Sequence, residues 1–246
     1  MVRKGIIVCD EQVPFHIDLS GVNKYIADEK PDIICRLGDM LDLRALTGWT
    51  NTAPADIDWG MVLEELAQGN SILDAQSRLH KPHDEHYWTG NHEERLEKFL
   101  AKHPAWVRKN PWVPSVVRDL NLKRRGMKVH SQMQLVRFGD LYMFHGDDYS
   151  TNHCRNNARN YGVKLAYGHV HTCERQTVPT PVDKSYRSAW SIGCLCDRDP
   201  DWKRGKPNSW VQGFATFYID ERGITTVYPI DIYKGQFVAP NGKLYK

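Results

Sequence analysis

Short apolar runs that end in polar residues recur along the first two-thirds of the chain. Each run is nearly continuous in apolar residues, which is typical of a strand buried on both faces. Each is soon followed by Asp, Asn or His. The runs lie at residues 5–9, 31–37, 86–88, 141–144 and 163–167.

Helices are predicted around these strands. In residues 59–79, apolar side chains recur with the spacing of one helix face, Val62 and Leu66 among them. Residues 19–29 and 93–102 are the other helix candidates. Buried strands that alternate with helices indicate a layered α/β fold, in which ligands collect at the loops beyond the strand ends.

The C-terminal part has a different pattern. Residues 185–191, 213–219 and 223–232 alternate like antiparallel strands, and residues 220–223 have the composition of a hairpin turn. We therefore predict a single α/β (α+β) domain over residues 1–246, with a mixed sheet or a β-sandwich flanked by helices.

The composition excludes some classes of protein. Apolar residues are 41% and charged residues 26% of the 246, which is ordinary for a soluble globular protein. The net charge of +3 is too small to indicate a nucleic-acid protein, although it suits an anionic substrate. No apolar run approaches the roughly 20 residues that span a bilayer, and no signal peptide is expected, so we predict a cytoplasmic protein without a membrane partner. Cys194 and Cys196 do not have zinc-finger spacing.

The polar clusters at the strand ends have the composition of a metal site. Carboxylate, imidazole and amide groups suit Mn²⁺, Fe and Zn²⁺, and two ions about 3.5–4 Å apart form a clamp for in-line attack at phosphorus. His169 and His171 are two residues apart, so on an extended segment both rings face one side. The same holds for Asp10 and Gln12.

Glycine precedes three of these clusters. We expect Gly38, Gly90 and Gly168 to let the chain turn sharply at the strand ends, because glycine adopts backbone angles that other residues avoid.

The clusters also match a family pattern. In order they are Asp10-Glu11-Gln12, Gly38-Asp39-Met40-Leu41-Asp42, Gly90-Asn91-His92-Glu93, His145-Gly146 and Gly168-His169-Val170-His171. This ordered set resembles the calcineurin-like metallophosphoesterase superfamily. Residues 12–16 and 192–195 are similar to a phage and prophage branch of it. The resemblance implies a four-layer fold, with a central β-sandwich of mixed sheets flanked by helices.

By position, the resemblance implies two divalent metal ions and their ligands. Asp10, Gln12 and His171 would hold the first ion, Asn91, His145 and His169 the second, and Asp39 would bridge them. A hydroxide held between the two ions would attack the phosphorus atom.

Three further residues are predicted to be catalytic, two from the resemblance and one from its position in the sequence near His92. His92 would be the general acid for the leaving oxygen, and Asp42 would hydrogen-bond His92 and fix its orientation. Arg95, one helical turn from His92, is the candidate clamp on a phosphate oxygen.

Gln12 departs from the common pattern, since many family members carry His at this position. An amide oxygen is a harder ligand than imidazole, so the first site should favour Mn²⁺ or Mg²⁺ over Zn²⁺. We predict two manganese ions, with Mg²⁺, Fe, Zn²⁺ and Ni²⁺ as alternatives. His16 is the alternative ligand to Gln12.

The resulting prediction is a metal-dependent phosphoesterase that prefers a phosphodiester, with a nucleotide or nucleic acid as its natural substrate. One alternative is a DNA or RNA nuclease resembling double-strand-break repair nucleases, although we expect the residues after His171 to complete the sheet rather than form a capping domain. The other is a non-catalytic scaffold on the same fold. Residues 43–60 and 147–160 are expected to shape the pocket, and the basic residues 123–128 form either a nucleic-acid contact or a solvated loop.

Overall fold

The computed structural model describes residues 1–47, 53–180, 184–200 and 203–246. Within these ranges, the strands form two large sheets and one small hairpin. In spatial order, the first sheet contains β11 (Thr225–Asp231), β10 (Gly213–Ile219), β1 (Arg3–Val8), β2 (Ile33–Arg36), β3 (Asp84–Trp88) and β4 (Lys128–His130). The second contains β5 (Val136–Phe138), β6 (Leu141–Phe144), β7 (Lys164–Tyr167), β9 (Ser185–Ile192) and β8 (Cys173–Thr180).

The two sheets pack face to face and enclose the main core. Ile7 and Cys35 from the first sheet meet Met143 and Ala166 from the second in one buried cluster. Successive residues of a strand point to opposite faces, so Ile6 points to the outer face of the first sheet. Burial on both faces explains why the strands read as continuous apolar runs.

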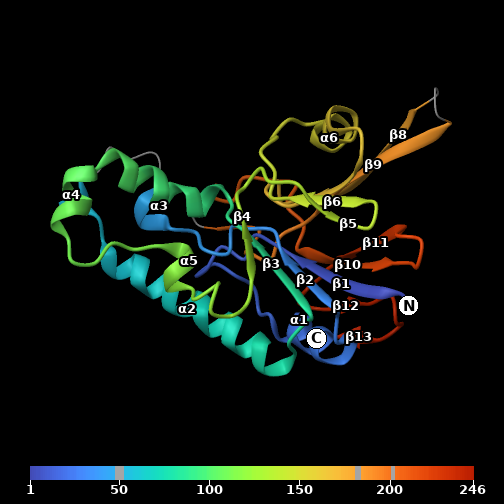
Figure 1. Cartoon of the computed structure of the whole chain (residues 1–246), viewed down its shortest axis with the longest axis horizontal. Helices are drawn as coiled ribbons and strands as arrows, with labels where there is room; N and C mark the ends of the chain where they lie inside the picture. Colours follow the sequence, from blue (N-terminus) through green and yellow to red (C-terminus); the bar gives the residue numbers. More distant parts are fainter. Residues whose placement is uncertain (48–52, 181–183, 201–202) are drawn as a thin grey trace.

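Helices cover the outer faces of this sandwich (Figure 1). Helix α1 (Ser20–Glu29) packs through Tyr25 and Ile26 against Ile6 of the first sheet. Helix α6 (His153–Tyr161) packs against Leu165 of the second sheet. Across the described residues the order of layers is therefore helix, sheet, sheet, helix, and the predicted four-layer architecture with a central sandwich of mixed sheets is confirmed.

A helical lobe extends the molecule beyond β3 and β4 (Figure 1). Its core joins Leu66 and Leu73 of the long helix to Tyr87 and Leu96. The lobe contains η1 (Arg44–Leu46), η2 (Pro54–Asp56), α2 (Trp59–Leu79), α3 (Asn91–Lys102), α4 (Pro104–Lys109) and α5 (Val116–Asp119). The hairpin of β12 (Phe237–Val238) and β13 (Leu244–Tyr245) lies beside α1.

The predicted elements are confirmed to within two residues at each end, whereas α6, β8 and the short elements η1, η2, α4, α5, β4, β5, β12 and β13 were not predicted. Helix α6 has the polar sequence HCRNNARNY, which lacks a continuous apolar stripe. Strand β8 lies at the edge of its sheet and is largely exposed, so little apolar patterning marks it. No helix in the described part of the chain is both long and apolar enough to cross a membrane.

The direction of the strands determines where a site can form. Strands β1, β2 and β3 run parallel in the first sheet, and β6 and β7 run parallel in the second. Their carboxyl ends meet at one edge of the sandwich, where contacts join the two sheets: the His169 N–H donates to Asp10 Oδ2 at 3.0 Å, and His145 Nδ1 lies 2.6 Å from Leu37 O. All five polar clusters therefore converge on this edge.

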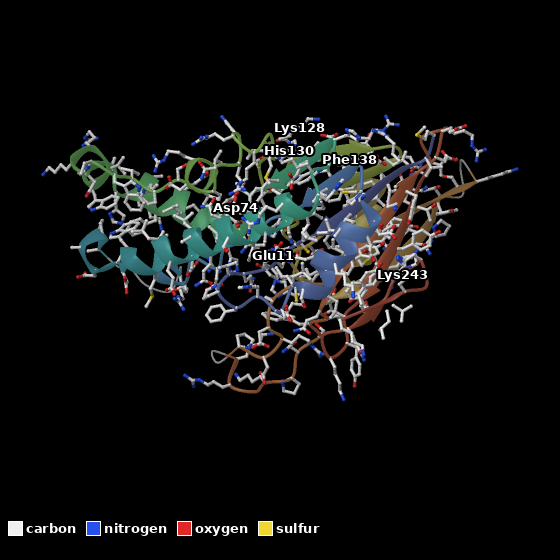
Figure 2. The ribbon with its side chains drawn as sticks, turned by 90° about the horizontal axis from the view of Figure 1, so that it is seen from below. Glu11, Asp74, Lys128, His130, Phe138 and Lys243 are labelled. Atoms are coloured by element: carbon white, nitrogen blue, oxygen red, sulfur yellow. The ribbon has the colours of Figure 1, made fainter. Side chains whose placement is uncertain are left out.

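A pair of histidines joins β3 to β4 away from that edge. His86 Nδ1 lies 2.8 Å from His130 Nε2, and the rings stack at 5.1 Å. Phe138 packs against His86 at 4.8 Å, and Figure 2 shows Phe138, His130 and Lys128 along one margin of the molecule. Burial lowers the pKa of His86, and burial together with the neighbouring His86 lowers the pKa of His130 to about 4.

This pair makes the stability depend on pH. A histidine in the unfolded chain binds a proton near pH 6.5, whereas the folded pair stays neutral to lower pH. The unfolded state then binds more protons, so the stability from the pair is present above about pH 6.5 and is lost as the pH falls toward 4. We expect His130→Gln to reduce the fall in unfolding free energy between about pH 7 and about pH 4.5 by about 1 kcal/mol, allowing for solvent screening of the partly exposed ring.

Urea unfolding at the two pH values measures this difference. The exposed His83 provides a matched control, and His83→Gln should leave the fall as in the wild type. If the unfolding free energy of His130→Gln falls between the two pH values as much as that of the wild type, the histidine pair does not cause the pH dependence.

Candidate metal centre

Four of the predicted ligands form one cluster at the convergent edge. Asn91 Oδ1 lies 3.0 Å from His145 Nε2 and 2.6 Å from His169 Nδ1. His145 Nε2 is 3.3 Å from His169 Nδ1 and 3.4 Å from Asp39 Oδ2. Metal–ligand bonds of about 2.1 Å give ligand–ligand edges of about 3 Å, so this spacing fits a single divalent ion.

The remaining predicted ligands form a second cluster. His171 Nε2 lies 3.1 Å from Asp10 Oδ1 and 3.2 Å from Gln12 Nε2. The other carboxylate oxygen of Asp10 accepts the backbone N–H of His169 at 3.0 Å, which connects the two clusters. All seven predicted ligands are thus gathered at one edge.

Two of the histidines are held with the ligating nitrogen toward the site. His145 Nδ1 lies 2.6 Å from Leu37 O, so its N–H donates there and the Nε2 lone pair faces the other ligands. His171 Nδ1 lies 3.8 Å from Cys196 Sγ, which similarly directs Nε2 toward Asp10. Such partners are typical of imidazoles that bind metal.

The charges of the site are strongly coupled. Burial alone would raise the pKa of Asp39 and Asp10, but protonated histidines outweigh it and lower both. Burial likewise opposes protonation of His145, yet Asp39 raises the pKa of His145 to about 9. Burial and the charge of His145 lower the pKa of His169 to about 4. The carboxylates of the site therefore stabilise positive charge on the histidines. A metal cation would displace these protons and take over that interaction.

The backbone at the ligands is unusual. Five of them have positive φ angles: Asp10 (56°), Gln12 (47°), Asp39 (53°), His169 (70°) and His171 (59°). Left-handed conformations cost about 1–3 kcal/mol each for residues other than glycine, and they gather at functional sites. The surrounding structure therefore holds these side chains in position against local preference.

The expected role of the glycines was right at one position and wrong at two. Gly38 has φ +97°, as predicted, but Gly90 is extended and Gly168 is not among the residues with positive φ. At Gly90 and Gly168, glycine is needed because a side chain would not fit. A Cβ at Gly90 would lie 2.0 Å from Asp39 Oδ1, and one at Gly168 would lie 2.6 Å from Asp10 Oδ2.

The three predicted catalytic residues are in contact. His92 Nδ1 lies 3.0 Å from Asp42 Oδ1, as predicted. Arg95 Nη1 donates to Asp42 O at 2.8 Å, and Arg95 Nη2 donates to His92 Nε2 at 2.9 Å. His92 Nε2 also lies 3.7 Å from Asp39 Oδ2, so the ring borders the metal ligands. Burial opposes protonation of His92, but Asp39 and Asp42 outweigh it and raise its pKa.

The alternative ligands to the first ion are distinguished by their contacts. Gln12 lies against His171 and His92, but it presents its amide nitrogen, so the carboxamide must rotate by half a turn to offer Oε1. His16 Nδ1 is buried without a hydrogen-bond partner, and no described contact links its ring to the site. Cys194 and Cys196 lie close enough to His171 to form a further donor cluster with it, although their spacing alone did not indicate one.

Glu93 was not predicted to support the site. Its buried carboxylate accepts the backbone N–H groups of Gly90 (2.8 Å), Asp39 (2.9 Å) and Leu41 (3.1 Å), and the hydroxyl of Tyr87 (3.1 Å). It therefore ties the loop after β2 to the loop after β3. Its position in the Gly-Asn-His-Glu motif was the available signal, but only the strand register shows what it contacts.

Two aromatic side chains at the rim were also missed as part of the site. Tyr149, which is 72% exposed, lies with its ring 4.1 Å from that of His169. The ring of Trp210 lies 4.1 Å from that of His171. Tyr149 belongs to the segment 147–160 that was expected to shape the pocket. The other expected segment, 43–60, lies partly outside the described residues.

Comparisons with known proteins give only distant similarities. No protein-family model matches the chain, and no curated protein matches its sequence. A single mutant of Vps29 from Entamoeba histolytica has 11% identity over 94% of both chains and a TM-score of 0.47. Vps29 from Chaetomium thermophilum has 12% identity over 94% of this chain and 92% of that one, with a TM-score of 0.47.

A Streptococcus pneumoniae protein described as a predicted phosphoesterase has 11% identity over 93% of this chain and 98% of that one, with a TM-score of 0.33. At TM-scores below 0.5, these similarities say nothing about activity or ligands. The resemblance to a phage branch stays a prediction.

The hydrogen bonds of Glu93 generate a stability prediction. Glu93→Gln should destabilise the protein by about 2 kcal/mol, because an amide NH₂ would face buried N–H donors that the carboxylate satisfies. Tyr87→Phe removes one of the four hydrogen bonds and should cost only about 1 kcal/mol. Urea unfolding near neutral pH measures both variants. Equal losses would indicate that Glu93 is already protonated and donates within the site.

Proposed function

We propose that this protein is a metal-dependent phosphoesterase with two divalent ions, manganese in the first instance. The observation that carries the proposal is the convergence of seven donor side chains, five of them on left-handed backbone, beside His92 and its partner Asp42. A scaffold without catalysis would not need that pair.

The donors divide between the two ions as their contacts suggest. Asn91, His145 and His169 would hold one ion, and the remaining donors Asp10, Gln12 and His171 the other, with Asp39 between them. Bound there, the ions would supply an acidified water as nucleophile and neutralise charge on the phosphate.

His92 would protonate the leaving oxygen. Its Nδ1 is bonded to Asp42, which fixes the ring and raises its basicity. Its Nε2 accepts a hydrogen bond from Arg95 in this structure. A phosphate oxygen that attracts the guanidinium would remove this contact, and Nε2 could then carry the proton. When Arg95 binds the phosphate, it would thus also free His92 Nε2 to carry the proton.

We further propose a phosphodiester, with a nucleotide or nucleic acid as the natural class. Aromatic rings lie against a histidine of each donor cluster, Tyr149 at His169 and Trp210 at His171. The exposed Tyr149 ring on one side, and Trp210 with Lys203 over its ring on the other, favour a substrate that extends to both sides of the phosphorus atom, which is a diester.

Metal dependence gives the first test. Metal-free protein should regain hydrolysis of an aryl phosphodiester with Mn²⁺, and more weakly with Mg²⁺ or Zn²⁺. Asp39→Ala should lose at least one bound ion and at least about 100-fold in kcat, because its carboxylate lies among the ligands. Elemental analysis and steady-state rates measure both. Asp140→Asn, in the β5–β6 turn, is the matched control. A wild-type protein that binds no metal would refute the proposal.

The role of His92 gives a sharper test. His92→Ala should lower kcat by about 10²–10⁴-fold for a diester with a poor alkoxide leaving group, and far less for a nitrophenolate, which needs no proton. Metal content should stay at the wild-type level, since the contact of His92 with Asp39 Oδ1 is made by its backbone N–H. Equal losses with both leaving groups would mean that His92 does not act as an acid.

A further inference from the structure

A basic and aromatic surface adjoins the metal centre on the side of His171. Lys203 Nζ lies 3.2 Å from the centroid of the Trp210 ring, whose own ring lies against His171. From this surface we propose that the protein binds single-stranded nucleic acid, with a base on Tyr149 and the phosphates beyond the cleaved bond on Lys203, Arg204 and Lys206. The inference rests on the proposed function and names its substrate.

The Tyr149 side provides a stacking surface. Its ring is fixed against His169, yet the residue is 72% exposed, so one aromatic face is open to solvent. Bases stack on such rings without regard to sequence. A base on Tyr149 would place its phosphate toward the cluster of Asn91, His145 and His169.

The Trp210 side provides positive charge. Lys203 is held over Trp210, and burial lowers its pKa, which indicates an ammonium group that has lost part of its water. Lys203, Arg204 and Lys206 line a hollow of about 380 Å³. These three residues lie between β9 and β10, in the part of the chain whose orange ribbon projects below the sandwich in Figure 2.

A second hollow continues along the same connection. It has a volume of about 510 Å³ and is lined by Arg198, Lys206 and Asn208, with Asp199 as the opposing charge. Lys206 lines both hollows, so the basic residues 203–206 continue from Trp210 into the second one. A strand whose successive phosphates contact these basic residues would run outward from the metal centre.

The basic residues beyond Trp210 favour a substrate that has several phosphates. A cyclic nucleotide or a dinucleotide has no phosphate beyond the cleaved bond, so it would leave Arg204 and Lys206 without a function. A strand several nucleotides long would contact them with successive phosphates. Stacking on one side and a track of cations on the other are the two features by which proteins bind single strands.

The test is binding without cleavage. Fluorescence anisotropy in EDTA would compare labelled DNA strands of two and eight nucleotides. The variant with both Arg204→Ala and Lys206→Ala should bind the octamer about 5- to 50-fold more weakly, and the slope of log K against log salt should become shallower by about 1.4, or 0.7 per lost contact. Tyr149→Ala should weaken binding of both strands about fivefold or more, and Tyr149→Phe should not.

The control removes two exposed cations elsewhere. Lys123→Ala with Arg124→Ala should change octamer binding less than twofold. In Mn²⁺, the ratio of kcat/KM for the octamer to that for an aryl diester should fall at least fivefold in the Arg204 and Lys206 variant only. Equal losses in the control, or no preference for the octamer over the dinucleotide, would overturn the inference.

The two proposals can fail separately. If the wild type cleaves the aryl diester but binds both strands alike, the strand site is wrong and the phosphoesterase stands. If it binds the octamer through Arg204 and Lys206 but cleaves no diester with any metal, the enzymatic proposal is wrong and the binding surface stands.

Discussion

The carboxylate of Glu93 is the contact on which the rest of the centre depends. It accepts hydrogen bonds from the backbone on both sides of the loop pair after β2 and β3, at Asp39, Leu41 and Gly90. Through these bonds it sets the distance between the carboxylate of Asp39 and the start of α3. Asn91 and His92, the first residues of that helix, are thereby positioned beside Asp39. A side chain with one acceptor oxygen, such as Gln, has only two lone pairs and could not accept all of these bonds.

The sandwich brings the other half of the centre to this point. Parallel strands in both sheets end at the same edge, so residues distant in sequence meet there without a long loop. Asp10 connects the two halves, because its two oxygens contact His169 and His171. The fold therefore fixes both donor clusters by backbone pairing, and little depends on side-chain flexibility.

Much of this could be predicted from the sequence, for physical reasons. Strands buried on both faces appear in the sequence as uninterrupted apolar runs. The polar donor residues directly after them stand out because they end each run. The resemblance supplied the grouping of donors, and the structure places Asp42 at His92 as expected. Exposed β8 and polar α6 left no comparable signal.

Other features depend on distances that sequence does not contain. Gly90 and Gly168 are required because two strand ends approach closely, which no local pattern reveals. Trp210 and Tyr149 could not be distinguished from ordinary aromatic residues, since their contacts with His171 and His169 appear only in the folded chain. The amide orientation of Gln12 is likewise a matter of neighbours.

The left-handed backbone at the ligands has an evolutionary consequence. Glycine adopts such conformations without strain, so replacing a ligand such as His169 or Asp39 by Gly would relieve it. A lineage released from selection for catalysis would therefore gain stability as it lost its ligands.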